Sequence, residues 1–210
     1  MKEFVISIMF FLIFFLAIPR ILLFSQEKQN QPPVKTALLI IDVQDFYFPG
    51  GSLPLVDPEA ASLKAKQLLE KFRHEKQLVI HVRHNAKTGA DIHLNVKPLP
   101  GEKVISKDFA NSFRGTDLLE YLNQNQVKRL VICGMQTHMC VEAATRAAAD
   151  FGFDCILVHD ACATRALKFE DKEVSAQDVH YSTLSALSRT YATVIDTKTF
   201  LEKYSTLSIH

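Results

Sequence analysis

Three residues of this chain combine side chains suited to nucleophilic catalysis, and each stands just past an apolar run. Asp42 follows Leu-Leu-Ile-Ile, and Lys107 follows Lys-Val-Ile-Ser. Cys140 stands a few residues beyond the run Arg-Leu-Val-Ile-Cys. A cysteine becomes a strong nucleophile when a carboxylate takes its proton and a lysine balances the negative charge. The three residue types therefore predict a nucleophilic cysteine, with Asp42 taking its proton and returning it to a leaving amine and Lys107 stabilising negative charge.

The segment that contains the cysteine reads Cys-Gly-Met-Gln-Thr-His-Met-Cys-Val, which predicts a sharp turn into a helix. Gly134 allows the backbone to turn, and Thr137 can cap a helix that begins at His138. Cys140 then lies in the first helical turn, where unpaired amides, the helix dipole and a nearby lysine all favour the thiolate. We therefore expect the pKa of this thiol to be lowered, with Asp42 as the group that accepts its proton.

The rest of the chain alternates short apolar runs with segments of helical period. The run Thr-Ala-Leu-Leu-Ile-Ile has no polar alternation, which indicates a strand buried on both faces. Segment 57–74 carries apolar residues on one helical stripe. We expect strands at residues 36–43, 77–83, 103–106, 129–133, 154–159 and 193–196, and helices at residues 57–74, 116–125, 138–151 and 175–190.

Strands that alternate with helices predict a mostly parallel sheet, because right-handed crossovers place helices on both of its faces. We therefore expect a doubly wound, three-layer α/β domain over residues 36–204. Ligands bind such sheets at the carboxyl ends of the strands, near the point where the strand order reverses. Asp42, Lys107 and Cys140 all follow predicted strand ends, so we expect them to share one edge of the sheet.

The residues that carry this chemistry resemble the motifs of the isochorismatase-like superfamily of cysteine hydrolases. The Asp-Val-Gln that begins at Asp42 is similar to the family's Asp-x-Gln signature. The Ser-Lys-Asp-Phe-Ala-Asn-Ser-Phe around Lys107 resembles its lysine loop, and segment 134–146 resembles its nucleophile segment. The resemblance covers residues 36–200. It implies a catalytic triad of Asp42, Lys107 and Cys140, and it implies a homo-oligomer.

The resemblance also implies an unusual backbone at the nucleophile. By position, a cis peptide bond that does not involve proline joins Met135 to Gln136. In the family this bond directs backbone amides into an oxyanion hole, here those of Gln136 and Cys140. Their role is to bind the negative oxygen that forms when the thiolate attacks a carbonyl group.

Phenylalanines are frequent around the predicted site. Phe113 resembles a pocket wall of the family's lysine loop, Phe109 lies in the same loop, and Phe46 follows the Asp-Val-Gln motif. These three rings either line a flat apolar substrate pocket or belong to the core or to a lid.

The motifs also bear on which substrate class the protein hydrolyses and on whether it uses a metal. Family members that hydrolyse isochorismate lack the cysteine, so its presence favours a small amide, carbamoyl or ureido substrate and a thioester acyl-enzyme. Residues 50–53 resemble nicotinamidases, but residues 83–85 read Arg-His-Asn where those enzymes carry an Asp-x-His metal motif. We therefore expect no metal and no cofactor. A metal site built from His81, His84 and His93 stays open as an alternative.

Other classes of protein are also consistent with the sequence. A noncatalytic small-molecule binding module on the same fold predicts an unreactive Cys140, and a nicotinamidase-like enzyme is a second alternative. A thiol redox protein is disfavoured because Cys140 has no Cys-x-x-Cys partner. Cys133 and Cys155 lie in apolar runs and read as buried thiols, although a bridge between Cys155 and Cys162 stays open.

The N-terminal segment differs from the rest of the chain. Residues 4–18 form an apolar run behind a lysine, which fits a signal peptide, whose apolar region spans about 7 to 15 residues. Residues 1–25 are therefore either a cleaved signal peptide, which predicts a periplasmic or extracellular protein, or a membrane anchor through residues 4–24. The third alternative is a cytoplasmic protein. Residues 26–35 read as a linker.

The charge pattern bears on the partners of the chain. The 24 basic and 23 acidic residues are interleaved and give a formal net charge of +1, which argues against a nucleic acid partner.

Overall fold

The computed structural model describes residues 34–204. The predicted N-terminal segment, the anchor it would form and most of the linker lie outside these residues. Within the described part of the chain, no helix is both long and apolar enough to cross a membrane. The expected homo-oligomer stays a prediction.

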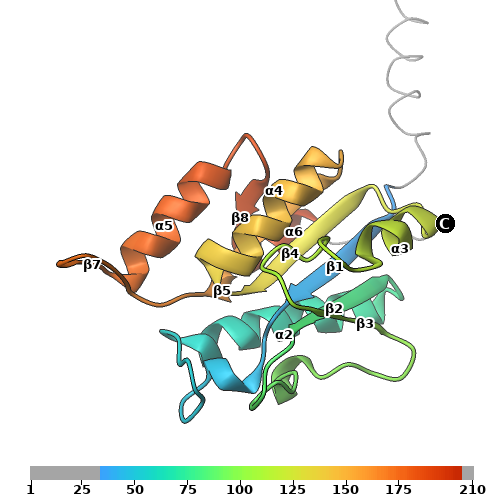
Figure 1. Ribbon diagram of the computed structural model, residues 1–210. Coiled ribbons are helices and arrows are strands. Elements are labelled where there is room, and N and C mark those ends of the chain that lie inside the picture. The colour runs from blue at the N-terminus through green and yellow to red at the C-terminus, as the bar shows by residue number, and fades with distance from the viewer. Residues whose placement is uncertain (1–33, 205–210) are drawn as a thin grey trace, which may run out of the picture. The chain divides into compact units, whose positions relative to one another are not determined.

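A single six-stranded sheet forms the centre of the described domain (Figure 1). Its strand order is β3-β2-β1-β4-β5-β8, and all neighbouring strands are parallel. This confirms the predicted α/β fold class with a mostly parallel sheet. The order reverses between β1 and β4, so the carboxyl ends of these two strands mark the expected ligand edge. The strands are β1 (Thr36–Ile41), β2 (Leu78–His84), β3 (Lys103–Lys107), β4 (Arg129–Met135), β5 (Asp154–Ala163) and β8 (Thr193–Ile195).

Helices cover both faces of the sheet, with α4 and α5 on one side and α2 on the other (Figure 1). On the α2 side, Phe72 of α2 and Phe200 of α6 stack at a centroid distance of 6.2 Å, so these two helices share a face. The helices are α2 (Pro58–His74), α3 (Leu118–Gln124), α4 (Glu142–Asp150), α5 (Ala176–Leu187) and α6 (Thr197–Lys203). Short 3-10 turns η1 (Asp45–Tyr47) and η2 (Leu94–Val96) and the hairpin of β6 (Leu167–Phe169) and β7 (Lys172–Val174) complete the fold.

Burial explains why the sequence pattern predicted these elements. All six residues of β1 are buried, as its continuous apolar run indicates. The apolar stripe of α2 is buried against the sheet, and each large side chain contributes about 1.5–3 kcal/mol to folding. This stripe consists of Ala61, Ala65, Leu68, Leu69 and Phe72.

Several parts of the fold differ from the prediction. The predicted helix 138–151 begins with a π-type turn, η3 (Thr137–Val141), before α4. Strand β5 extends to Ala163 through an irregularity in its pairing with β4. The sequence also gave no signal for the β6–β7 hairpin, because its side chains are mostly exposed and leave no pattern of burial.

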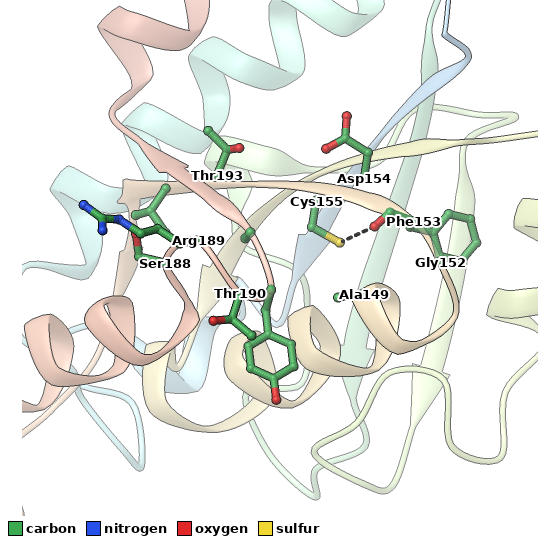
Figure 2. Close-up of a pocket in the computed structure, with 12 residues that line it drawn as sticks. Ala149, Gly152, Phe153, Asp154, Cys155, Ser188, Arg189, Thr190 and Thr193 are labelled. Atoms are coloured by element: carbon green, nitrogen blue, oxygen red, sulfur yellow. Dashed lines mark hydrogen bonds between the residues drawn. The ribbon is translucent and has the colours of Figure 1, made fainter.

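One cavity, of about 630 Å³, lies at the amino ends of β5 and β8 (Figure 2). Its wall includes Asp154 and Cys155 at the start of β5 and Thr193 at the start of β8. This is the opposite edge of the sheet from the predicted site, and ligands of open α/β sheets bind at the carboxyl ends of the strands. We therefore do not assign this cavity to the predicted chemistry.

Candidate active site

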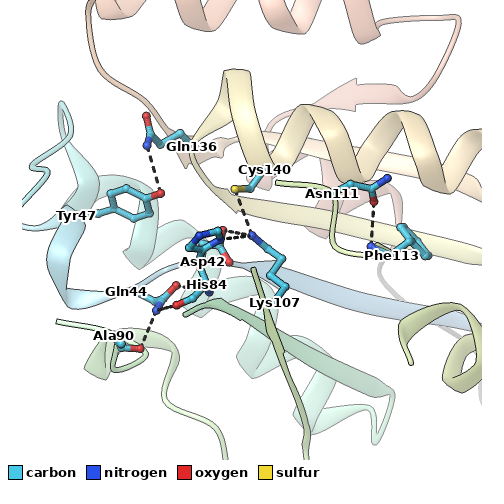
Figure 3. A network of polar contacts seen from close by, with 10 residues as sticks. All are labelled: Asp42, Gln44, Tyr47, His84, Ala90, Lys107, Asn111, Phe113, Gln136 and Cys140. Carbon is cyan, nitrogen blue, oxygen red and sulfur yellow. Dashed lines mark hydrogen bonds and ion pairs between the residues drawn. The ribbon is translucent and has the colours of Figure 1, made fainter. Parts of the chain in front are cut away.

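The three residues singled out in the sequence meet at the carboxyl edge of the sheet (Figure 3). Lys107 Nζ lies 2.7 Å from Asp42 Oδ2 and 3.3 Å from Cys140 Sγ. Asp42 follows β1, Lys107 ends β3, and Cys140 lies in η3 after β4. The exposed fractions of these residues are 0%, 1% and 6%, so the whole cluster is removed from water.

Close approach of β4 to β1 brings the nucleophile turn to the aspartate. Gly134 of β4 has a φ of 129° and pairs with Ile41 of β1. A Cβ atom on Gly134 would stand 1.9 Å from the carbonyl oxygen of Ile41, so only glycine fits here. Asp42, the first residue after β1, has a φ of 50°, a left-handed conformation that aspartate tolerates better than most residues.

The backbone between β4 and Cys140 has the form that the resemblance implied. The peptide bond between Met135 and Gln136 is cis. The carbonyl oxygen of Gln136 accepts hydrogen bonds from the amides of Met139 and Val141, at 3.0 and 3.3 Å, which produces the π-type turn. Such turns are rare in proteins overall, and those that occur are often found at functional sites. The oxyanion hole formed by the amides of Gln136 and Cys140 stays a prediction.

Thr137 does not cap the helix as expected. Its hydroxyl donates to the carbonyl oxygen of Ala163 at 3.3 Å and lies 2.9 Å from Nδ1 of His180. Through these two contacts, Thr137 connects the turn that carries Cys140 to the end of β5 and to α5.

The pKa of Cys140 differs from the expectation in direction. Burial and, to a smaller extent, the negative charge of Asp42 raise the pKa of the Cys140 thiol, Lys107 opposes both effects, and the net result is a pKa of about 12. The expected lowering by the helix terminus and the lysine is thus outweighed by desolvation. Burial also raises the pKa of Asp42, while Lys107 opposes that rise. The thiol is protonated at neutral pH and needs a base.

The predicted pocket residues Phe46 and Phe109 have different surroundings. Phe46 is buried and packs edge-on against Tyr47, with ring centroids 4.2 Å apart. Tyr47 reaches the site, because its hydroxyl accepts a hydrogen bond of 3.2 Å from the Gln136 side chain. Phe109 is 42% exposed and lies 3.8 Å from the guanidinium of Arg114. Their roles in a substrate pocket stay predictions.

Phe113 packs against two other phenylalanines. Its ring lies against Phe151 and Phe153, which follow α4, at centroid distances of 5.2 and 6.4 Å. Its role as a pocket wall stays a prediction.

The three histidines that could have formed a metal site point to different partners. His81 Nε2 lies 2.9 Å from a Glu102 oxygen, and the His93 ring stacks on Phe48 at 3.6 Å. His84 instead reaches the central cluster, with Nδ1 lying 3.2 Å from Lys107 Nζ. The sequence analysis did not assign His84 a role there. Its position at the end of β2 could have indicated this role, because the carboxyl ends of the strands form the ligand edge.

Among the described residues, one other set of side chains has donor atoms close enough together to hold a metal ion. Donor atoms of Asp42, His84 and Cys140 all lie within 4.8 Å of one another. The Lys107 ammonium contacts all three of these residues.

Arg165, just after β5, is another residue that the sequence analysis missed. Its Nε is buried and has no hydrogen-bond partner in the described part of the chain. Burial raises the pKa of Tyr47 and lowers the pKa of His138, and the positive charge of Arg165 is close enough to oppose the first shift and to add to the second. An arginine with an unpaired nitrogen therefore stands beside the site.

All four cysteines of the chain are free and buried. Cys155 and Cys162 lie near opposite ends of β5, so the bridge left open by the sequence does not form.

Comparison with known proteins gives the family. A model of the isochorismatase domain matches residues 36–199. The chain belongs to the isochorismatase family. It is 45% identical to the isochorismatase family protein YddQ of Bacillus subtilis, over 80% of this chain and 99% of that protein. It is 30% identical to the maleamate amidohydrolase of Pseudomonas putida, over 62% of this chain and 73% of that enzyme.

Solved structures agree with this assignment. The isochorismatase hydrolase of Oleispira antarctica superimposes with a TM-score of 0.76 at 43% identity, covering 80% of this chain and 96% of that one. The chain is thus an isochorismatase-family hydrolase by descent, with a buried cysteine next to a lysine and an aspartate at the ligand edge of its sheet.

Proposed function

We propose that this isochorismatase-family protein is a cysteine amidohydrolase that cleaves a small amide, carbamoyl or ureido substrate. The observation that carries the proposal is the buried contact of Lys107 Nζ with Asp42 Oδ2 and Cys140 Sγ, at 2.7 and 3.3 Å. A buried charge pair beside a cysteine is costly to fold unless it has a task. Nucleophilic attack by Cys140 supplies that task.

In the acylation step, Asp42 accepts the proton of the Cys140 thiol while the sulfur bonds to the substrate carbonyl carbon. The carbonyl electrons move to the oxygen, which the amides of Gln136 and Cys140 bind in this proposal. The carbon–nitrogen bond then breaks, and the leaving nitrogen takes the proton from Asp42. The Lys107 ammonium stabilises the negative charge that develops on the sulfur.

In the deacylation step, water attacks the thioester and gives one proton to Asp42. The bond between the carbonyl carbon and the sulfur breaks, and the sulfur takes that proton back. The net reaction turns an amide and water into an acid and an amine, with the enzyme unchanged. The raised pKa of Asp42 supports this role, because a carboxylate with a raised pKa is a stronger base.

The surroundings of the thiol support a substrate with an anionic group. Arg165 offers a buried nitrogen without a partner, and guanidinium groups pair with carboxylates in a two-pronged geometry. We therefore include amides that carry a carboxylate among the proposed substrates. The similarity to an enzyme named maleamate amidohydrolase supports amide hydrolysis.

The proposal is tested by ammonia release from a panel of small amides, carboxylate-bearing monoamides, carbamoyl amines and nicotinamide. The full chain is compared with Cys140→Ala, each with and without a chelator. Cys155→Ala is the matched control, because burial also raises the pKa of the Cys155 thiol to about 12 but this residue lies at the opposite edge of the sheet.

Turnover that is lost only in Cys140→Ala and resists the chelator is the expected result. Turnover that the chelator abolishes would favour the nicotinamidase-like alternative. The absence of turnover across the panel, with an unreactive Cys140, would favour a noncatalytic binding module on the same fold.

A further inference from the structure

The ammonium group of Lys107 has a third partner besides the aspartate and the cysteine. Its nitrogen lies 3.2 Å from Nδ1 of His84, and Figure 3 shows the imidazole ring beside the ammonium. A lysine ammonium has three N–H donors and no acceptor. Asp42, Cys140 and His84 therefore account for one donor each.

This contact fixes the state of the histidine ring. Because the ammonium can only donate, Nδ1 of His84 must accept, and the ring must be neutral with its proton on Nε2. An imidazolium would have no lone pair for Lys107 and would place a second positive charge in contact with the first. The neutral ring is thus the form that fits the site.

The backbone of His84 is held by a buried side chain. The side-chain oxygen of Gln44 accepts from the His84 amide at 2.8 Å, and its nitrogen donates to the His84 carbonyl oxygen at 3.0 Å. The same nitrogen donates to the carbonyl oxygen of Ala90 at 2.7 Å. Strand β1 has ended at Ile41, so the Gln44 amide takes the place of a strand neighbour for His84. Gln44 is completely buried.

The sheet register then directs the two side chains to the same region. His84 is the register partner of Lys107 in the parallel pairing of β2 with β3. Side chains at paired positions of neighbouring strands point to the same face of a sheet. His84 is thus aimed at the ammonium by its strand and held in place by Gln44.

We propose that His84 is a positioning residue of the site, which keeps the Lys107 ammonium in contact with Cys140 Sγ. Sulfur is a weak acceptor, and its distance of 3.3 Å to Lys107 Nζ is longer than the 2.7 Å to Asp42 Oδ2. Without a third acceptor, the ammonium is free to turn toward the carboxylate and away from the sulfur. Only the effect of His84 on turnover rests on the proposed function.

The test compares His84→Asn with His84→Leu. The two new side chains have nearly the same size and shape, but only asparagine can place an acceptor oxygen at the position of Nδ1. The first readout is the rate of Cys140 alkylation by iodoacetamide, followed by mass spectrometry of its peptide. The second is kcat and KM on a substrate that the wild-type chain hydrolyses. Thermal unfolding checks each variant, and His84→Ala replaces the leucine variant if that one does not fold.

We expect His84→Asn to stay near the wild-type alkylation rate and His84→Leu to be about tenfold slower or more, which corresponds to one lost hydrogen bond to a charged group. On a substrate, the leucine variant should lose kcat with little change in KM. Equal alkylation rates in the two variants would overturn the inference. If the wild type hydrolyses nothing but the alkylation order holds, the proposed function fails and the role of His84 stands.

Discussion

Lys107 and Asp42 form an ion pair in which neither side chain is exposed to solvent, with Nζ 2.7 Å from Oδ2. Two charges this deeply buried are each tolerated only because the other is present, and removal of one partner from a buried pair costs about 3–5 kcal/mol. The pair also sets the charge environment of Cys140, since one member raises the pKa of the thiol and the other lowers it.

Asp42→Asn should separate thiol reactivity from hydrolysis. Removal of the negative charge lowers the pKa of Cys140, so alkylation at pH 8 should become several-fold faster. Amide hydrolysis should fall by about 10²–10⁴, because the base is gone. The measurement is the alkylation rate beside ammonia release. In the wild type, alkylation should rise about tenfold per pH unit below the thiol pKa of about 12.

Asp154→Asn is the matched control, because Asp154 raises the pKa of the Cys155 thiol at the far edge of the sheet. It should leave both rates at Cys140 unchanged. Slower alkylation in Asp42→Asn would contradict the predicted effect of the Asp42 charge on the thiol, and unchanged hydrolysis would contradict the role of Asp42 as base.

Lys107→Met should convert the cluster into a metal site. The lysine contacts Asp42, His84 and Cys140, and these three residues can supply an oxygen, a nitrogen and a sulfur ligand to a thiophilic divalent ion. With the ammonium gone, Co²⁺ should bind at least about tenfold more tightly than to the wild type, with an absorption band from cobalt–thiolate bonding. Addition of Cys140→Ala should abolish that band. Equal Co²⁺ affinity in Lys107→Met and the wild type would show that the lysine does not keep metal out.

Gly134→Ala should destabilise the fold more than an ordinary glycine substitution. The added Cβ would meet the Ile41 carbonyl oxygen at 1.9 Å, so β4 must move away from β1. We expect a loss of about 3 kcal/mol or more in the free energy of unfolding, measured in guanidinium chloride. Gly152→Ala is the matched control: its φ is 87°, yet nothing lies within 4 Å of the new Cβ. It should cost only about 1 kcal/mol. Equal losses would mean that φ, and not the close approach, limits position 134.

Glu102→Gln should reduce the acid sensitivity of the fold. Hydrogen bonds from Arg73, the Leu99 amide and His81 lower the pKa of Glu102 to about 2, against the opposing effect of burial. A lowered carboxyl pKa contributes stability that is present above the ordinary value of 4.5 and is lost as the pH falls through about 2. The contribution is about 3 kcal/mol at neutral pH.

The variant should therefore be less stable at pH 7 and show a flatter loss of stability between pH 4.5 and about 2 in urea titrations. Glu70→Gln, at an exposed position on α2, is the control and should follow the wild type. If the stability of Glu102→Gln falls with pH as steeply as that of the wild type, Glu102 is not the cause of the acid sensitivity.

The proximity of Asp42, Lys107 and Cys140 could be predicted from the sequence, because each of these residues lies at or just after the end of a strand. Carboxyl ends of parallel strands share one edge, so residues placed just past Leu-Leu-Ile-Ile, at the end of β3 and after β4 were expected to meet there. That reasoning placed Asp42, Lys107 and Cys140 correctly without any knowledge of strand order. The apolar stripe of α2 was predicted from its helical period, which a single sequence also contains.

The remaining features depend on information that a single sequence does not contain. His84 reaches Lys107 because β2 pairs with β3 in a register that places them side by side. The raised pKa of Cys140 depends on burial by segments far away in the chain, so local helix-terminus reasoning gave the wrong direction.

The most direct test of the account is the mass of the enzyme quenched in acid during turnover of an amide substrate. A thioester on Cys140 predicts that the peptide containing this residue gains the mass of the acyl group, and that Cys140→Ala shows neither the gain nor the hydrolysis. Hydrolysis that continues in Cys140→Ala, or steady turnover with an acyl group on no cysteine, would contradict the central claim that Cys140 is the nucleophile.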